Sequence, residues 1–299
     1  MRLNRDGEDR MKLSIIIVNY NTYELTKQTI QAVIGQDTRF EYEIILVDNA
    51  SVDGSIQRLQ QDFEELIVQE KLRVFRNGEN LGFAKANNQG IKVSKGTYIL
   101  LLNSDTELEA NCLEKCMAKI ESDKGIGALG CKVVLADGRL DHACKRGYPT
   151  PLASLYYFLG LDKKNPMKYG QYAALHLGED EEGEVDALTG AFMLMPKLVL
   201  SEVGILDEDF FMYGEDIDLC YRIKAAGYKI LYYPKAKTIH YKGGSSKKRR
   251  TKVIYDFHNA MWIFYKKHYV TKYNMWINRL VYIGIWSKYV VEIIRNFFK

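Results

Sequence analysis

Short apolar runs that end in polar residues recur along the first half of the chain. The runs cover residues 13–19, 42–48, 72–76 and 97–108, and helical patterns occupy residues 23–34 and 83–93. A continuous apolar run of this length is typical of a strand buried on both faces of a parallel sheet. Strands that alternate with helices at this spacing predict an α/β fold, with a mostly parallel, doubly wound sheet flanked by helices.

The polar residues at the ends of these runs are candidates for a binding site. Asn19 ends the first run and Asn21 follows it, Asp48 ends the second, and Asn103 and Asp105 lie in the fourth. Open α/β sheets bind ligands at the carboxyl ends of their strands, where these side chains would meet. Turn formation and helix capping by the same residues remain the alternative.

Two familiar nucleotide-binding signatures do not occur in the sequence. No G-x-G-x-x-G follows the first run, and G-x-x-x-x-G-K-[ST] occurs nowhere. A dinucleotide dehydrogenase and a P-loop ATPase are therefore disfavoured. An acid such as Asp48 can instead accept the imide N–H of uracil or thymine, which adenine and cytosine do not present.

The second half of the chain contains further regular patterns around an irregular segment. Helices are predicted for residues 110–121 and 197–203, and strands for residues 126–135, 185–195 and 228–233. Between residues 141 and 183 the periodicity is lost. A long irregular segment inside a domain is typical of a functional lid or a mobile loop.

Three acids, Glu215, Asp216 and Asp218, fall in the first turn of another predicted helix, directly after aromatic residues. The helix dipole favours acids at a helix N-terminus, so a charged helix start is the simple explanation. Three acids with aromatic neighbours exceed what capping requires, which favours a functional role. His240 lies where the regular pattern ends, and a structural histidine is the alternative to a metal ligand there.

Composition narrows the class of protein further. Hydrophobic residues make up 47% of the chain and charged residues 27%, which excludes wholesale disorder. The five cysteines form no C-x-x-C, which predicts reduced, packed thiols in a cytoplasmic protein. No apolar segment precedes the first strand, so no cleavable signal peptide is expected.

The last part of the chain, residues 247–299, is basic and rich in aromatic residues, and only Asp256 and Glu292 oppose its positive charge. Residues 280–294 are strongly apolar, but Lys288 and Glu292 interrupt them, so they fall short of a membrane span. This pattern predicts an amphipathic helical tail on the inner face of the cell membrane. Packing against the core and a homodimer contact are the alternatives, and nucleic acid is disfavoured because no binding motif accompanies the charge.

Five motifs, in order, resemble those of family-2 glycosyltransferases, and in particular the bacterial dTDP-rhamnosyltransferases. They lie at residues 14–21, 47–51, 79–90, 102–105 and 211–220. The resemblance covers residues 13–246 and leaves residues 1–12 as an N-terminal extension. It implies a Rossmann-like GT-A fold, inverting transfer of a sugar from a nucleoside diphosphate donor, and Mg²⁺ or Mn²⁺ as cofactor.

The resemblance also implies roles for individual residues. Those placed in the nucleotide-sugar pocket are Asn19, Asn21, Asp48, Arg76, Asn103, Asp105 and Glu215. Asp105 takes the place of the metal-binding acid of the family's D-x-D motif, in which Asn103 replaces the first acid. His240 matches a histidine that completes the metal shell, and Asp216 matches the catalytic base. A single carboxylate is compatible with Mg²⁺ or Mn²⁺ when a diphosphate fills the remaining ligand positions.

The expected function is therefore transfer of L-rhamnose from dTDP-L-rhamnose to a lipid-linked saccharide in bacterial cell-surface polysaccharide synthesis. A UDP-hexose or UDP-N-acetylhexosamine donor is the first alternative, because Asp48 would serve uracil and thymine alike. A sugar-phosphate nucleotidyltransferase and a noncatalytic membrane-binding module are the others. The nucleotidyltransferase is disfavoured because Asn19-Tyr-Asn-Thr follows the first strand in place of a Gly-rich, Arg-containing loop.

Overall fold

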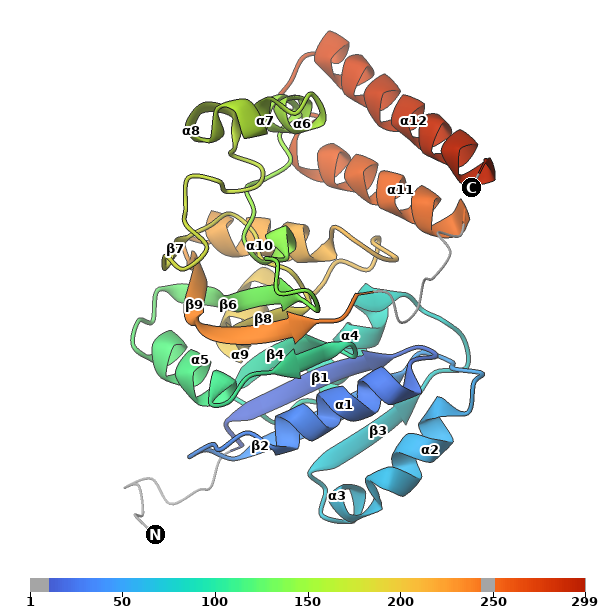
Figure 1. The fold of residues 1–299 in the computed structure, drawn as a ribbon, viewed down its shortest axis with the longest axis vertical. Coiled ribbons are helices and arrows are strands. Elements are labelled where there is room, and N and C mark those ends of the chain that lie inside the picture. The colour runs from blue at the N-terminus through green and yellow to red at the C-terminus, as the bar shows by residue number, and fades with distance from the viewer. Residues whose placement is uncertain (1–10, 243–250, 299) are drawn as a thin grey trace.

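The computed structural model describes residues 11–242 and 251–298, which are built around one mixed sheet (Figure 1). The strands follow the spatial order β3-β2-β1-β4-β8-β6-β9-β5, and β7 pairs with β9 beside this path. Their bounds are β1 (Leu13–Asn19), β2 (Tyr42–Asp48), β3 (Leu72–Arg76), β4 (Tyr98–Asn103), β5 (Thr106–Leu108), β6 (Ile126–Leu135), β7 (Gly183–Glu184), β8 (Phe192–Pro196) and β9 (Lys229–His240).

The sheet has a parallel half and a mixed half. Strand β1 pairs in parallel with β2 and β4, and β2 pairs in parallel with β3. Strand β8 runs antiparallel to both β4 and β6, and the short strands β5 and β7 run antiparallel to β9. The expected parallel sheet is therefore confirmed for the N-terminal half, while the other half also contains antiparallel pairs, which need no crossover helix.

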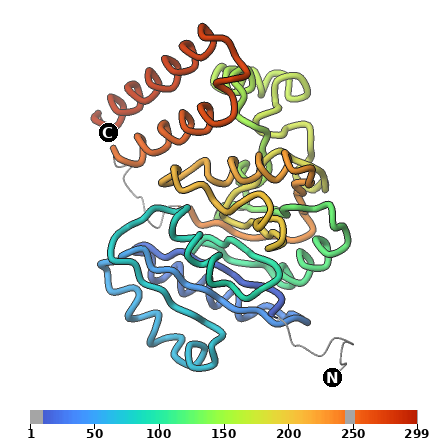
Figure 2. Tube along the Cα trace, turned by 180° about the vertical axis from the view of Figure 1, so that it is seen from behind, coloured from blue at the N-terminus to red at the C-terminus, as the bar shows by residue number. Residues whose placement is uncertain are grey.

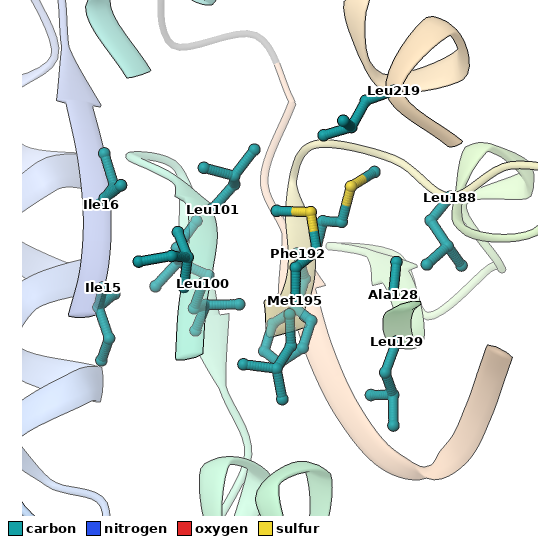
Figure 3. Close-up of a cluster of buried hydrophobic side chains, with 14 of the residues drawn as sticks. Ile15, Ile16, Leu100, Leu101, Ala128, Leu129, Leu188, Phe192, Met195 and Leu219 are labelled. Atoms are coloured by element: carbon teal, nitrogen blue, oxygen red, sulfur yellow. The ribbon is translucent and has the colours of Figure 1, made fainter. Parts of the chain in front are cut away.

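Buried side chains cover both faces of the central strands (Figure 3). Ile15 and Ile16 of β1 are adjacent and both fully buried, as are Leu100 and Leu101 of β4. Since successive side chains of a strand point to opposite faces, such pairs require cover on both sides of the sheet. This explains why these strands read as unbroken apolar runs in the sequence.

Helices flank the sheet and alternate with strands in the N-terminal half (Figure 1). Those in the first part of the chain are α1 (Tyr23–Ile34), α2 (Ser55–Asp62), α3 (Glu64–Val68), α4 (Phe83–Val93) and α5 (Cys112–Glu121). The later ones are η1 (His142–Cys144), α6 (Pro151–Phe158), α7 (Leu161–Lys164), α8 (Pro166–Tyr169), α9 (Lys197–Val203), α10 (Glu215–Ala225), α11 (Thr251–His268) and α12 (Met275–Phe297).

Several boundaries differ from the sequence prediction. The 97–108 run divides into β4 and β5 around the turn at Ser104 and Asp105. Only the end of the predicted 185–195 strand is a strand, and β9 continues seven residues beyond the predicted end at Tyr233, to His240. The irregular segment 141–183 contains η1, α6, α7, α8 and the start of β7, and helices α2 and α3 had no prediction. The five cysteines are free, buried thiols.

The C-terminal helices pack on the rest of the protein. Ala260, Phe264, Tyr265 and Tyr269 belong to the same cluster of buried side chains as the sheet. Helix α12 lies along α11, and both lie beside the 141–183 segment, at the far end of the molecule from β3 (Figure 2). Packing against the core, one of the alternatives for the tail, is thus observed for α11.

Parts of two sequence predictions fall outside the described residues. These are most of the N-terminal extension, residues 1–10, and the basic residues 247–250 at the start of the tail, together with Lys299. Within residues 11–242 and 251–298, no helix combines the length and the apolar character needed to cross a membrane.

Candidate active site

The ends of β1 and β2 are joined by a buried polar network. The Asn19 amide donates hydrogen bonds to Asp48 Oδ1 at 2.7 Å and to the hydroxyls of Ser51 and Ser55, both at 2.9 Å. Asp48 Oδ2 accepts the backbone N–H of Ser51 at 3.1 Å. Asn19 and Asp48 therefore lie together at the carboxyl edge of the sheet, as predicted, and they also hold the loop after β2 in place.

Asn21 and Arg76 lie on either side of this network. Asn21 has a φ of 55°, and its side-chain oxygen accepts the N–H of Val52 at 2.8 Å. Arg76 ends β3 directly beside Asp48 in the parallel register, and its side chain is exposed. The structure thus gives Asn21 a turn-forming role and leaves the guanidinium of Arg76 accessible beside Asp48.

The ends of β4 and β9 bring three predicted residues together. His240 Nε2 lies 3.1 Å from Asp105 Oδ1 and 3.4 Å from the amide nitrogen of Asn103. The backbone supports this arrangement, since β5 pairs with β9 at Thr106 and His240. Residues separated by more than 130 positions in sequence therefore form one polar cluster at the sheet edge.

Asp141, which sequence reasoning missed, completes the surroundings of His240. Its Oδ2 lies 3.1 Å from His240 Nδ1, and its Oδ1 accepts a hydrogen bond from Lys242 at 2.8 Å. Burial lowers the pKa of His240, but the carboxylates of Asp105 and Asp141 outweigh this and raise it to about 9. With Nδ1 on Asp141, the ring is held with Nε2 directed at Asp105, an orientation typical of metal-binding histidines.

We expect the stability of the metal-free protein to fall with rising pH because of His240. Its pKa of about 9 exceeds the ordinary value of 6.5, so its stabilisation is complete below pH 6.5 and is lost as the pH rises through 9. Between pH 6.5 and 9, the wild type should lose about 3 kcal/mol more of its free energy of unfolding than His240→Gln does, as measured by urea unfolding across this range. An identical loss in the two proteins would contradict the raised pKa of His240.

The start of α10 presents two acids with different surroundings. Asp216 Oδ2 accepts hydrogen bonds from Arg146 Nη2 at 2.7 Å and from the N–H of Gly190 at 3.3 Å. Glu215 is buried, and one of its carboxyl oxygens has no hydrogen-bond partner. Burial and the adjacent charge of Asp216 raise the pKa of Glu215 to about 8, so Glu215 is protonated at neutral pH while Asp216 pairs with Arg146.

Two glycines position the start of α10. Gly214 has a φ of 84°, a conformation that glycine adopts without strain, and it directly precedes Glu215. Gly82 has a φ of 85°, and a Cβ there would lie 2.4 Å from the carbonyl oxygen of Phe211. Since the N–H of Phe83 also bonds that oxygen at 2.7 Å, the 79–90 and 211–220 motifs meet in the folded protein.

The third acid of α10, Asp218, has a structural role. It is almost fully buried and accepts hydrogen bonds from Arg222 Nε at 2.9 Å and, with its other oxygen, lies 2.7 Å from His268 Nε2 at the end of α11. The His268 ring also contacts Tyr221, with ring centroids 4.1 Å apart. Asp218 therefore ties the helix that carries Asp216 to the C-terminal helices.

Replacing Asp218 with Ala should destabilise the protein by about 3 kcal/mol, because it removes the buried carboxylate that the Arg222 guanidinium and the His268 ring both contact. Urea unfolding followed by circular dichroism measures this loss. Asp123→Ala is a matched control, since Asp123 pairs with Lys229 at the surface, and we expect its effect to stay within about 1 kcal/mol. Equal effects of the two substitutions would contradict a structural role for Asp218.

Side chains from these clusters line one cavity of about 530 Å³. Its wall includes Asn103 and His240 from the polar cluster, together with Arg146, Glu215 and Asp216. Another part of the wall comes from α6, α11 and α12. The predicted base and one predicted metal ligand therefore face the same space, whereas Asn19, Asp48 and Arg76 lie outside its lining.

The residues at the β4 and β9 ends fit a divalent cation with a bound diphosphate. Asp105 offers a carboxylate, His240 offers Nε2, and the side-chain oxygen of Asn103 is buried without a hydrogen-bond partner. Such oxygen and imidazole donors suit Mn²⁺, and Mg²⁺ also accepts one or two carboxylates with phosphate oxygens. Among the described residues, no group of three or more His, Cys, Asp or Glu side chains could hold a metal ion.

Arg146 and Asp141 had no signal in the sequence. Both lie at the start of the 141–183 segment, where periodicity is absent, and a lone Lys-Arg pair or a lone Asp is common in loops. Only the tertiary structure distinguishes them, because Arg146 pairs with Asp216 and Asp141 with His240, each from a distant part of the chain.

Solved structures define the class of the fold. GalNAc-T7 with UDP, GalNAc and Mn²⁺ has a TM-score of 0.62 and 19% identity, with 87% of this chain and 50% of that chain covered. The mannosyltransferase PcManGT from Pyrobaculum calidifontis, in complex with GDP-Man and Mn²⁺, has a TM-score of 0.60 and 18% identity, with 86% and 64% covered. The sheet and its helices form a GT-A fold, as predicted.

Sequence comparison identifies the family. The family model described as Glycosyl transferase family 2 matches residues 14–177, and the one described as Glycosyl transferase family group 2 matches residues 98–297. The chain belongs to glycosyl transferase family 2.

The relatives include two proteins named as rhamnosyltransferases. Rhamnosyltransferase WbbL of Escherichia coli K12 is 27% identical over 76% of this chain and 82% of its own. The N-acetylglucosaminyl-diphospho-decaprenol L-rhamnosyltransferase of Mycobacterium tuberculosis H37Rv is 25% identical over 74% and 73%. An uncharacterized protein, y4gI of Sinorhizobium fredii, is 26% identical over 78% of this chain, which spans only 25% of that protein.

Proposed function

We propose that this chain transfers L-rhamnose from dTDP-L-rhamnose to a hydroxyl of a lipid-linked saccharide, with inversion at the anomeric carbon. The observation that carries the proposal is the shared cavity, because Asp216 and His240 lie on its wall and Asp105 contacts His240. The names of the two rhamnosyltransferase relatives support the sugar, and the decaprenol in one of those names supports a lipid-linked acceptor.

In the proposed reaction, Asp216 takes the proton of the acceptor hydroxyl as its oxygen bonds to the anomeric carbon. The bond between that carbon and the nucleoside diphosphate breaks on the opposite face. Arg146 fixes one oxygen of the Asp216 carboxylate through its 2.7 Å hydrogen bond. Glu215, which keeps its proton at neutral pH, adds no negative charge beside the base.

The proposed metal position is formed by Asp105 and His240, with the side-chain oxygen of Asn103 adjacent. A divalent ion held there would neutralise the charge that develops on the departing diphosphate. Asp141 would keep His240 Nε2 available by holding Nδ1. Asp48 and Arg76, next to each other at the ends of β2 and β3, are the proposed contacts of the nucleotide base, with Asn19 supporting Asp48.

A donor screen tests the proposal. Purified protein would be assayed with dTDP-rhamnose, UDP-glucose, UDP-galactose and UDP-N-acetylglucosamine, with Mg²⁺ or Mn²⁺ and after chelation, by measuring both turnover and binding. Metal-dependent preference for dTDP-rhamnose is the expected result. Preference for a UDP-sugar would show that the donor is not dTDP-rhamnose, while the protein would still be a glycosyltransferase. Absence of binding to any nucleotide sugar would overturn the proposed function.

We also propose that residues 247–299 hold the protein on the inner face of the cell membrane. The support is the outer face of α12, where large apolar side chains are exposed: Trp276, Leu280, Ile283, Val290, Ile294 and Phe297. Arg279 and Arg295 on the same helix are exposed and suit anionic headgroups. A lipid-linked acceptor confined to a membrane would be reached more often by an enzyme held on that surface.

The double variant Leu280→Ser and Ile283→Ser should bind anionic vesicles at least about tenfold more weakly than the wild type, because two exposed apolar side chains are lost. Sedimentation with phosphatidylglycerol vesicles measures the difference. The double variant Val68→Ser and Leu198→Ser removes side chains from the catalytic part that are at least as exposed, and it should bind normally. If α12 instead forms a homodimer contact, vesicle binding will be unchanged and the sedimentation coefficient will fall.

A further inference from the structure

The cavity that contains Asp216 continues into an apolar compartment. Three elements that are distant in sequence form its wall there, namely α6, α11 and α12. Figures 1 and 2 both place the 141–183 segment, which carries α6, beside the C-terminal helices. The volume of about 530 Å³ lies within the range of about 300–1,000 Å³ that small-molecule sites occupy.

The lining of this compartment consists largely of hydrocarbon and aromatic side chains. Its members are Tyr157 and Phe158 from α6, Met212 before α10, and Val253, Ile254, Phe257, Met261 and Phe264 from α11. Phe158 and Phe257 remain 47% and 39% exposed, so these two lining rings are not buried in the hydrophobic core. Such surface is available to an apolar ligand.

Helix α12 closes the compartment from a third side. Lys288 Nζ lies 3.9 Å from the ring centroid of Phe158 and 5.9 Å from that of Phe257, and it also lies 3.8 Å from Glu292. The contact joins α12 to α6 across the compartment. Further apolar side chains are exposed at Leu152 on α6 and at Leu159, directly after α6.

We propose that this compartment binds the hydrocarbon chain of a lipid-linked acceptor, next to the sugar that receives the transferred residue. The inference rests on the proposed function. The apolar compartment and Asp216 line the same cavity, so a ligand in the compartment lies next to Asp216. Of the two substrates, the acceptor is the one whose hydroxyl must contact that side chain. The enzyme therefore acts on a sugar close to the lipid, since a long saccharide would carry the chain away from the apolar wall.

An acceptor with no lipid would leave this wall without a partner. A carbohydrate presents hydroxyl groups, whose burial against hydrocarbon without hydrogen bonds is unfavourable. A hydrocarbon chain needs no such partners and gains from removing Phe158 and Phe257 from water. The chemistry of the wall thus favours a lipid over a further saccharide unit.

Binding of farnesyl diphosphate to the purified full chain tests this proposal, with inorganic diphosphate, farnesol and dodecyl phosphate as comparison probes. Isothermal titration calorimetry would be performed with dTDP and Mn²⁺ present, so that the proposed donor site is filled. We expect farnesyl diphosphate to bind at least about tenfold more tightly than inorganic diphosphate, because only it can use the apolar wall. Dodecyl phosphate then shows whether a straight alkyl chain is bound as well as an isoprenoid chain.

The double variant Phe158→Ser and Phe257→Ser should weaken farnesyl diphosphate binding at least about tenfold. Leu155→Ser with Tyr255→Ser is the matched control, because these residues lie on the same two helices, are 50% and 43% exposed, and are not part of the lining. The control should bind within twofold of the wild type. Circular dichroism melting verifies that both variants are folded.

Equal binding of inorganic and farnesyl diphosphate would overturn the inference, as would unchanged binding by the Phe158 and Phe257 variant. The assay contains no sugar transfer, so it can succeed even if the donor screen shows that the proposed function is wrong. Conversely, the Phe158 and Phe257 variant could turn over a lipid-linked acceptor as fast as the wild type. That result would support the proposed function and contradict the lipid compartment.

Discussion

Asp216→Asn should reduce sugar transfer at least about 1,000-fold while nucleotide-sugar binding stays within a few-fold of the wild type. The amide cannot take the proton of the acceptor hydroxyl, and general-base catalysis contributes about 10²–10⁴-fold to enzymatic rates. Asn is nearly isosteric and can still accept a hydrogen bond from Arg146. Initial rates with dTDP-rhamnose, together with calorimetric titration of the donor, separate the two effects.

The matched control for this variant is Asp209→Asn. Asp209 is an exposed residue of the preceding loop that pairs with Lys267 at the surface, and Lys267 retains Asp207 as a second partner. We expect the control to keep full activity. Near-normal turnover of Asp216→Asn would show that another group removes the proton, and loss of donor binding would show that Asp216 acts before the chemical step.

Asp105→Ala should weaken the binding of Mn²⁺ in the presence of UDP or dTDP by more than about 100-fold. Even residues that only support a metal ligand change metal affinity by about 10–100-fold, and Asp105 is the one carboxylate proposed to contact the ion directly. The bound fraction of Mn²⁺ can be followed by electron paramagnetic resonance, which does not depend on turnover. Transfer activity should fall in parallel.

Glu107→Ala provides the comparison for Asp105. Glu107 lies two residues further on, and its exposed side chain bonds the hydroxyl of Tyr241. Its loss should leave Mn²⁺ affinity unchanged, whereas His240→Asn should give a loss smaller than that of Asp105→Ala. If Asp105→Ala retains metal-dependent activity, the proposed position of the metal is wrong.

Much of the fold was predictable because the central strands are buried on both faces. Residues 13–19 and 42–48 are nearly all buried, and their predicted bounds match the structure. Before the polar ends Asn19 and Asp48, only Ser14 and Glu43 interrupt the apolar pattern, and these two are buried and hydrogen-bonded to each other. The predicted bounds are wrong where residues are buried without belonging to a regular strand or helix. The β8 region was predicted too long because the apolar residues before Phe192 pack on the core without forming a strand.

The candidate site divides in a similar way. Asp48, Asp105 and Asp216 could be selected as candidates from the sequence, because each lies at or next to the end of an element, within a motif that resembles a known family. The contact of Asp216 with Arg146 and that of His240 with Asp141 could not be predicted, because they connect residues 70 and 99 positions apart. The structural role of Asp218 was equally hidden, since its partner His268 lies 50 positions away.

The sequence by itself determined the family motifs, the alternation of strands and helices, and the identity of the residues at the strand ends. These features are local, because they depend on apolar periodicity and on short runs of neighbouring residues. Only the tertiary structure decided that Asp141 orients His240, that Asp218 ties α10 to α11, and that α6, α11 and α12 enclose one apolar space beside Asp216. Such contacts join distant segments, and no periodicity along the chain encodes which of them will meet.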